Sequence, residues 1–183
     1  MIYTMRDDYS KIILKIMCKD MNSRDKTMIE IGSYAGESTE IFAQNFKYVW
    51  AIDPWLEGMM ITEGVGYMDN PECFMDKNVE KIFDERMKGY PNVSKIKDFD
   101  KNCLNDFVDE SIDFIYIDAL HTETELIRQI NSWLPKIKKT GIIGGHDYAE
   151  SFPGVIEAVH KTVGMPDKIY MDDGNSWSKY KCI

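Results

Sequence analysis

The chain of 183 residues is predicted to adopt an α/β fold, with a seven-stranded, mostly parallel sheet, helices on both faces and a C-terminal β-hairpin. Three observations predict it. Short apolar runs alternate with helix-length amphipathic segments, glycine-containing turns separate many of them, and only a short turn at 173–175 separates the last two runs. With 44% hydrophobic residues the chain can bury a full core, and residues 1–183 are expected to form a single domain.

The elements follow in order along the chain. Residues 6–22 predict a helix that packs on the sheet edge as part of an N-terminal cap (1–26), with its apolar positions at Tyr9, Ile12, Ile13, Ile16, Met17 and Met21. Further helices are expected near 37–46, 78–89, 122–138 and 154–163. Strands are expected near 27–32, 48–53, 93–98, 112–118, 141–145, 168–172 and 177–182.

The segment 54–77 breaks this rhythm, because glycines and Pro71 are mixed there with methionines and aromatic residues. We expect a mobile lid that closes over bound ligands and excludes water. A dimer contact and a plain surface loop are the alternatives, so a homodimer is left open.

Charge and composition exclude several classes. A net charge of −9 and a pI near 4.8 argue against a nucleic-acid partner, because no basic face is available to neutralise phosphates. The basic run 136–139 is expected at a helix end, where cations complement the dipole. No signal peptide or long apolar run is found, so a cytoplasmic protein without membrane association is expected. The cysteines lack metal-type spacing and are expected as free thiols, with a disulfide left open, at Cys18, Cys73, Cys103 and Cys182.

The turn between the first strand and the next helix is typical of a nucleotide site. Gly32 and Gly36 allow close backbone approach, and Asp53, about 20 residues on, is placed to bond a ribose diol. The G-x-x-x-G spacing differs from the G-x-G-x-x-G of dinucleotide sites, and Glu30 would repel a phosphate and favour a cation. Alternatively, Glu30 only caps a neighbouring backbone group. The pattern resembles motif I of class I S-adenosylmethionine (SAM) methyltransferases.

Two later motifs, at 113–121 and 140–148, extend this likeness. Together with 152–155 and motif I, they resemble the SAM-dependent methyltransferases of type 24, whose relatives include small-molecule and sugar O-methyltransferases, over residues 27–182. The resemblance implies a Rossmann-like sheet with ligands beyond the carboxyl ends of its strands. It implies SAM as cofactor, bound by Glu30, Gly32, Ser33, Tyr34, Gly36, Ser38, Asp53, Trp55, Asp98, Phe99 and Asp118.

The acceptor side is expected where the fourth and fifth strands end. Methyl transfer to a small hydroxylated acceptor needs a general base or a metal that lowers the alcohol pKa. The candidate catalytic residues are Asp118, His121 and His146. The candidate metal ligands are Asp118, Asp147 and His146, with His121 as the alternative histidine. Carboxylates alone would suit Mg²⁺, whereas a histidine ligand favours Mn²⁺, Fe²⁺ or Zn²⁺. Each residue also has a structural alternative: contact with SAM only, a helix cap, or a buried, satisfied histidine.

Departures from the family pattern put the acceptor in doubt. An aromatic residue and an acid are common where this chain has Glu123 and Gln129, and Thr140 replaces the first of two glycines. His160 is expected as ordinary surface. Two other functions compete with this one: a nucleotide-binding oxidoreductase on a Rossmann-like sheet, and a catalytically idle SAM-binding or interaction protein. The absence of a G-x-G-x-x-G motif in the sequence counts against the oxidoreductase.

Overall fold

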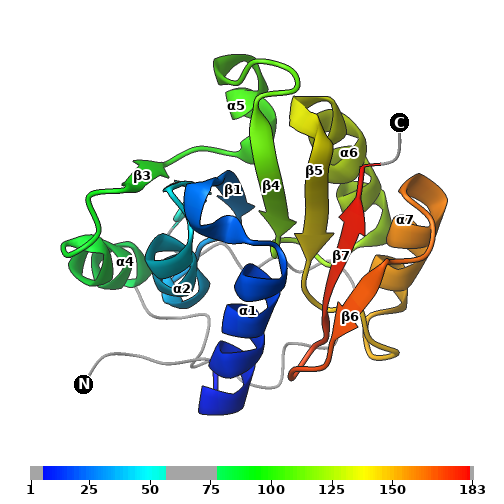
Figure 1. The fold of residues 1–183 in the computed structure, drawn as a ribbon, viewed down its shortest axis with the longest axis horizontal. Helices are drawn as coiled ribbons and strands as arrows, with labels where there is room; N and C mark the ends of the chain where they lie inside the picture. The colour runs from blue at the N-terminus through cyan, green and yellow to red at the C-terminus, as the bar shows by residue number, and fades with distance from the viewer. Residues whose placement is uncertain (1–5, 57–77, 182–183) are drawn as a thin grey trace.

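The computed structural model describes residues 6–56 and 78–181, which contain a seven-stranded sheet of order β3-β2-β1-β4-β5-β7-β6 (Figure 1). The strands are β1 (Thr27–Ile31), β2 (Tyr48–Ile52), β3 (Val93–Ile96), β4 (Ile112–Ile117), β5 (Ile137–Gly145), β6 (Lys168–Tyr170) and β7 (Ser176–Tyr180). Strands β1 to β5 are parallel, and β7 is antiparallel to both β5 and β6. The predicted fold class is confirmed, including the C-terminal hairpin.

Helices cover both faces of the sheet (Figure 1). They are α1 (Asp8–Asp20), α2 (Glu37–Asn45), α4 (Val79–Met87), α5 (Asp100–Cys103), α6 (Glu123–Trp133) and α7 (Pro153–Thr162). Helices α1 and α2 share one buried cluster, and α6 and α7 share another on the opposite face. In the part of the chain that the structure describes, three short 3-10 helices lie at the connections: Ser23–Asp25, Leu104–Asp106 and Leu134–Lys136.

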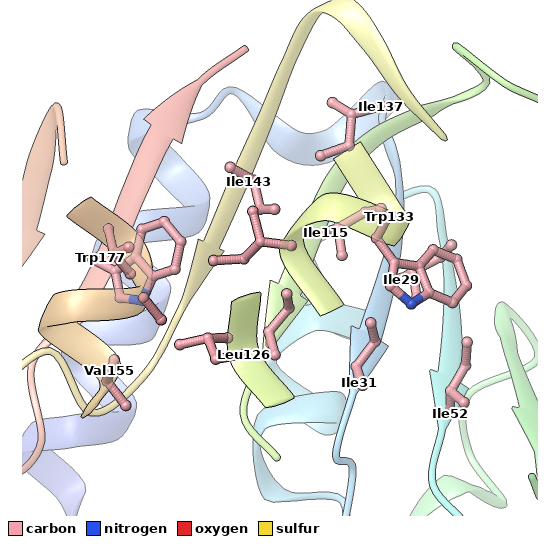
Figure 2. Close-up of a cluster of buried hydrophobic side chains, with 14 of the residues drawn as sticks. Ile29, Ile31, Ile52, Ile115, Leu126, Trp133, Ile137, Ile143, Val155 and Trp177 are labelled. Atoms are coloured by element: carbon pink, nitrogen blue, oxygen red, sulfur yellow. The ribbon is translucent and has the colours of Figure 1, made fainter. Parts of the chain in front are cut away.

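Successive residues of each central strand point to opposite faces and so build these two cores. On β4, Phe114 and Tyr116 pack with α1 and α2, whereas Ile115 and Ile117 pack with α6 and α7. Figure 2 shows the second core, in which Trp133 is fully buried. Burial on both faces is why the central strands read as nearly continuous apolar runs.

The structure corrects the expected boundary between the long helix and the fifth strand. Helix α6 ends at Trp133, before Pro135, whose ring nitrogen carries no N–H to continue a helix. Strand β5 already begins at Ile137, so most of the basic run 136–139 lies in a strand and not at a helix end. Two of its lysines contact acidic side chains at 2.6 and 2.8 Å.

The buried face of α1 also differs from the expected one. The helix packs against α2 and β6 through Leu14, Met17 and Cys18, together with Met21 directly after its end. Three residues assigned to the packing face from their spacing are exposed instead, namely Tyr9, Ile12 and Ile16. Apolar residues occur almost all around this helix, so their periodicity did not single out one face.

Several expectations fall on residues 57–77 and 182–183, outside the described part of the chain. They include most of the expected lid, together with Cys73 and Cys182. Cys18 and Cys103 are buried free thiols, as expected. Within 6–56 and 78–181, no helix is long and apolar enough to cross a membrane.

Candidate active site

The carboxyl ends of the parallel strands lie level, and the residue after each strand continues the hydrogen-bonded ladder. The N–H groups of Gly32, Asp118, His146 and Asp53 each donate to the last residue of a neighbouring strand, at 2.9, 2.8, 3.2 and 3.2 Å respectively. These residues therefore form a row across the carboxyl ends of the parallel strands, where ligands bind in open α/β folds.

The glycines of the first turn are required by contacts within the protein. Gly32 has φ +89°, and a Cβ there would lie 2.0 Å from the backbone oxygen of Asp118. Gly36 has φ +80° at the start of α2, where a Cβ would lie 2.9 Å from the ring of Phe83. Only glycine fits either position, so the turn lies directly against the end of β4 and against α4.

Glu30 supports this turn from beneath. Its side chain is fully buried, and Oε2 accepts hydrogen bonds from Ser33 Oγ at 2.8 Å and from Thr39 Oγ1, whereas Oε1 has no hydrogen-bond partner among the described residues. Burial raises the pKa of Glu30 to about 7, although these hydroxyls and Ser38 oppose the shift. Ser33 and Ser38 are themselves buried. Glu30 thus orders the turn that would hold a cofactor.

Asp53 accepts hydrogen bonds from the backbone of the same turn and of the segment after β2. Its two carboxylate oxygens accept the N–H groups of Tyr34 and Trp55 at 2.9 and 2.7 Å, and burial raises its pKa. The indole N–H of Trp55 donates to the Tyr34 carbonyl at 2.7 Å, while its ring packs against Phe83. Trp55 is therefore placed as a support beneath Tyr34. Asp53 is partly exposed and has lone pairs left for a ribose diol.

Replacing Asp53 with alanine should weaken S-adenosylhomocysteine (SAH) binding by about 1.5 to 3 kcal/mol, because a charge-assisted hydrogen bond of that size is lost. Isothermal titration calorimetry measures the affinity. Asp109→Ala removes an exposed carboxylate paired with Lys136 and serves as the control. An unchanged affinity in a folded Asp53→Ala protein would remove Asp53 from the site.

Asp98 and Phe99 follow β3, next to Asp53 in the strand order. Asp98 is exposed, and its Oδ1 accepts from the Phe99 N–H and from Asn102 Nδ2, both at 2.7 Å, which orders the start of α5. The Phe99 ring is half-buried, with Lys101 Nζ 5.3 Å from its centroid. Phe99 thus lies after β3, the strand next to β2 and its Asp53, and its role beside an adenine stays a prediction.

Three potential metal ligands converge after β4 and β5. Asp118, His121 and Asp147 each offer one ligand atom, and these atoms lie within 4.8 Å of one another. His121 Nε2 is 2.6 Å from Asp147 Oδ2 and 3.9 Å from Asp118 Oδ1. Asp147 is buried and has φ +60°, a strained conformation that turns the chain at the end of β5.

His146, the other predicted ligand, contacts a second group of acids. Its Nδ1 lies 3.1 Å from Asp147 Oδ1, and its Nε2 lies 3.4 and 3.2 Å from carboxylate oxygens of Asp172 and Asp173. The distance from Nδ1 to Asp118 Oδ1 is 4.0 Å. His146 therefore bridges Asp147 to the turn before β7, and the geometry groups His121, not His146, with the two predicted carboxylate ligands.

Arg6 completes the charge pattern on the expected acceptor side. Its Nη2 donates to Asp118 Oδ2 at 2.5 Å, and its Nη1 lies 3.3 Å from His146 Nε2. Burial raises the pKa of Asp118, but His146, His121 and Arg6 outweigh it and hold the pKa below its usual range. Burial lowers the pKa of His121, but Asp118 and Asp147 raise it to about 9. Carboxylates in this part of the site are thus neutralised by an arginine and a protonated histidine.

The sequence did not identify Arg6, Asp172 or Asp173 as site residues. Arg6 and Asp118 are separated by 112 positions, and only the packing of α1 brings them together. The turn 173–175 was recognised as a turn, but its position beside His146 depends on the antiparallel pairing of β7 with β5. His160, expected as surface, is exposed and bonds the Tyr148 hydroxyl at 2.7 Å.

Comparison with known families gives one match. The sequence model of a family described as a methyltransferase domain, of type 24, matches residues 29–148. This range runs from the first strand through the glycine turn, Asp118 and Asp147. No curated protein matches the chain.

Solved structures share the fold at low sequence identity. A candidate O-methyltransferase from Klebsiella pneumoniae superposes with a TM-score of 0.66 and 14% identity over 96% of this chain and 81% of that one. A candidate methyltransferase from Streptococcus mutans, in complex with SAH, gives 0.60 and 14% over 96% of both chains. For Haemonchus contortus phosphoethanolamine N-methyltransferase 1, with phosphoethanolamine and SAH, the values are 0.54 and 14% over 78% of this chain, which spans only 26% of that protein.

Proposed function

The chain belongs to the type-24 methyltransferase-domain family, and from this premise we propose that it transfers the methyl group of SAM to a hydroxyl oxygen of a small acceptor, such as a sugar, with a divalent metal ion assisting. The observation that carries the proposal is the convergence of Asp118, His121 and Asp147 beside the glycine turn. Cofactor and acceptor groups then lie at adjacent strand ends.

The reaction sets the requirement for this side of the site. The acceptor oxygen attacks the sulfonium methyl carbon, the C–S bond breaks, and sulfur keeps the electron pair, which yields SAH and a methyl ether. The hydroxyl proton must leave, because a neutral alcohol is a poor nucleophile. A bound divalent ion would lower the pKa of that hydroxyl.

The donor set fits such an ion. Two carboxylates and an imidazole suit Mn²⁺, Fe²⁺ or Zn²⁺ better than Mg²⁺, which prefers oxygen ligands alone. The pKa of His121 is about 9 without an ion, so His121 is protonated at neutral pH and must release its proton to ligate. A protonated His121 cannot serve as the base in that state.

His146 is proposed as the positioning residue and as the route for the acceptor proton. Nδ1 of His146 contacts Asp147, and Nε2 contacts Asp172. The Asp172 side chain is fully buried and accepts hydrogen bonds from Ser176 N and Oγ, both at 2.9 Å. Burial lowers the pKa of His146, but neighbouring anionic groups raise it well above its ordinary value. A cation on the adjacent carboxylates would lower that pKa and free the imidazole to take a proton.

Replacing His146 with alanine should lower turnover about 10- to 100-fold and leave SAH affinity unchanged, because an outer partner of a metal ligand is lost while the cofactor side is intact. The assay detects methylated products by mass spectrometry after incubation with SAM, Mn²⁺ and a panel of hydroxylated small molecules that includes sugars. His160→Ala, on the exposed surface of α7, is the matched control and should keep full turnover.

Three results would contradict parts of this proposal. If chelation and Mn²⁺ add-back leave turnover unchanged, the metal has no part in the reaction. Full activity of both His146→Ala and His121→Ala would instead remove the histidines from the acceptor side. SAH binding without product from any acceptor would favour an idle SAM-binding protein.

A further inference from the structure

The segment before α1 delivers a fixed positive charge into the proposed metal site. We infer that Arg6 is a tethered cation that competes with the divalent ion for Asp118, so that the ion binds only when the guanidinium leaves. The inference rests on the proposed metal assistance. It makes Arg6 the residue that sets the affinity of the site for cations.

Both sides of Arg6 are held in place. Its backbone N–H donates to Glu37 Oε2 at 3.2 Å, and Glu37 is the first residue of α2, directly after the glycine turn. Asp7, the next residue, caps α1 by accepting the Ser10 N–H at 2.7 Å. These two hydrogen bonds hold the backbone of Arg6 and Asp7 beside the start of α2 and at the start of α1. The Arg6 side chain extends from there to Asp118.

The contact occupies a group that the ion needs. Arg6 Nη2 lies 2.5 Å from Asp118 Oδ2, and the side chains are only 11% and 18% exposed. A guanidinium has no lone pair to offer a metal and does not deprotonate. An ion on Asp118, His121 and Asp147 would therefore place a second cation on the same poorly hydrated carboxylate, where like charges repel strongly.

A shared carboxylate is the competing arrangement, with the ion on one oxygen and arginine on the other. In the structure Arg6 is on Oδ2, and Oδ1 is the oxygen nearer His121. The burial of both side chains favours competition over sharing, because two cations on one poorly hydrated carboxylate repel strongly. The two arrangements predict opposite effects of removing Arg6. If Arg6 competes with the ion, its removal should raise the metal affinity, and if Arg6 helps to hold a shared carboxylate, its removal should lower that affinity.

The test is calorimetric titration of Mn²⁺ into the wild-type chain, Arg6→Ala, Arg6→Lys and Arg128→Ala. Arg6→Ala should bind Mn²⁺ about tenfold more tightly or better, because apparent affinity rises as the fraction of competent molecules rises. Arg6→Lys keeps the charge and should stay close to wild type. Arg128 makes a comparable pair with the buried Asp100, at 2.7 and 2.8 Å, so Arg128→Ala should leave Mn²⁺ affinity unchanged.

Thermal unfolding supplies a second readout. Saturating Mn²⁺ should raise the melting temperature more for Arg6→Ala than for wild type, because ligand stabilisation grows with affinity. If Arg6→Ala does not fold, Arg6→Gln removes the charge and keeps a donor for Asp118. Equal or weaker Mn²⁺ binding by the uncharged variants, with wild type binding, overturns the inference and leaves the metal proposal standing. Failure of every protein to bind Mn²⁺ overturns both.

Discussion

Replacing Gly32 with alanine should lower the free energy of unfolding by about 3 kcal/mol or more and abolish SAH binding. Gly32 has φ +89°, and the added Cβ would lie 2.0 Å from the Asp118 carbonyl oxygen and 2.7 Å from its carbonyl carbon. Both are backbone atoms at the end of a central strand and cannot rotate away. Relief requires separating the turn from β4, which disrupts the cofactor side. Denaturant unfolding and calorimetry with SAH measure the two effects.

Two other glycines separate the effect of backbone strain from the effect of the close contact with β4. Gly164 has φ +77°, and an added Cβ there would meet no atom within 4 Å, so Gly164→Ala should show only the backbone strain, about 1 to 2 kcal/mol. Gly89 has open space and no such φ, and its alanine variant should be nearly neutral. If Gly32→Ala costs no more than Gly164→Ala, the close approach to β4 contributes nothing.

Replacing Glu30 with glutamine should make the protein more stable than wild type at about pH 8, by about 3 kcal/mol. Burial raises the pKa of Glu30 from 4.5 to about 7, so the folded state holds this proton more tightly than the unfolded chain. The stabilisation from protonated Glu30 is complete below about pH 4.5 and is lost as the pH rises through about 7. Glutamine keeps the shape and cannot ionise.

The measurement is unfolding free energy against pH for both proteins. Their difference should grow between pH 4.5 and 7 and then level off. Glu157→Gln, on the exposed side of α7, reports the effect of removing a surface charge. Parallel curves for wild type and Glu30→Gln would show that Glu30 ionises alike in the folded and unfolded states.

Much of the fold was predictable because strand and helix periods differ and the central strands are buried on both faces. The ends of β1, β2 and β4 each fall within a residue of the expected position, since an acid or glycine follows each apolar run. The start of β5 was missed because its first half is polar and partly exposed. Helix α5 has only four residues, too few for any period to show.

The site was predictable only where local motifs carry it. The family match agrees with the glycine turn and removes the oxidoreductase alternative. Spacing could not decide which histidine joins Asp118 and Asp147, because His121 and His146 follow different strands and both reach the carboxylates. The role of Glu30 beneath the turn also required the three-dimensional structure, since burial of a carboxylate is invisible in a single sequence.

The two sides of the site are built from different kinds of structure. On the cofactor side, Glu30 and Asp53 are bonded to the turn between β1 and α2, so change there is coupled to the core. The proposed acceptor side includes the turn between the edge strand β6 and its neighbour β7, where Met171 and Asp173 are largely exposed. Surface turns tolerate substitution better than packed elements. During evolution, substitutions in this one turn could therefore change the acceptor while the cofactor side stays constant.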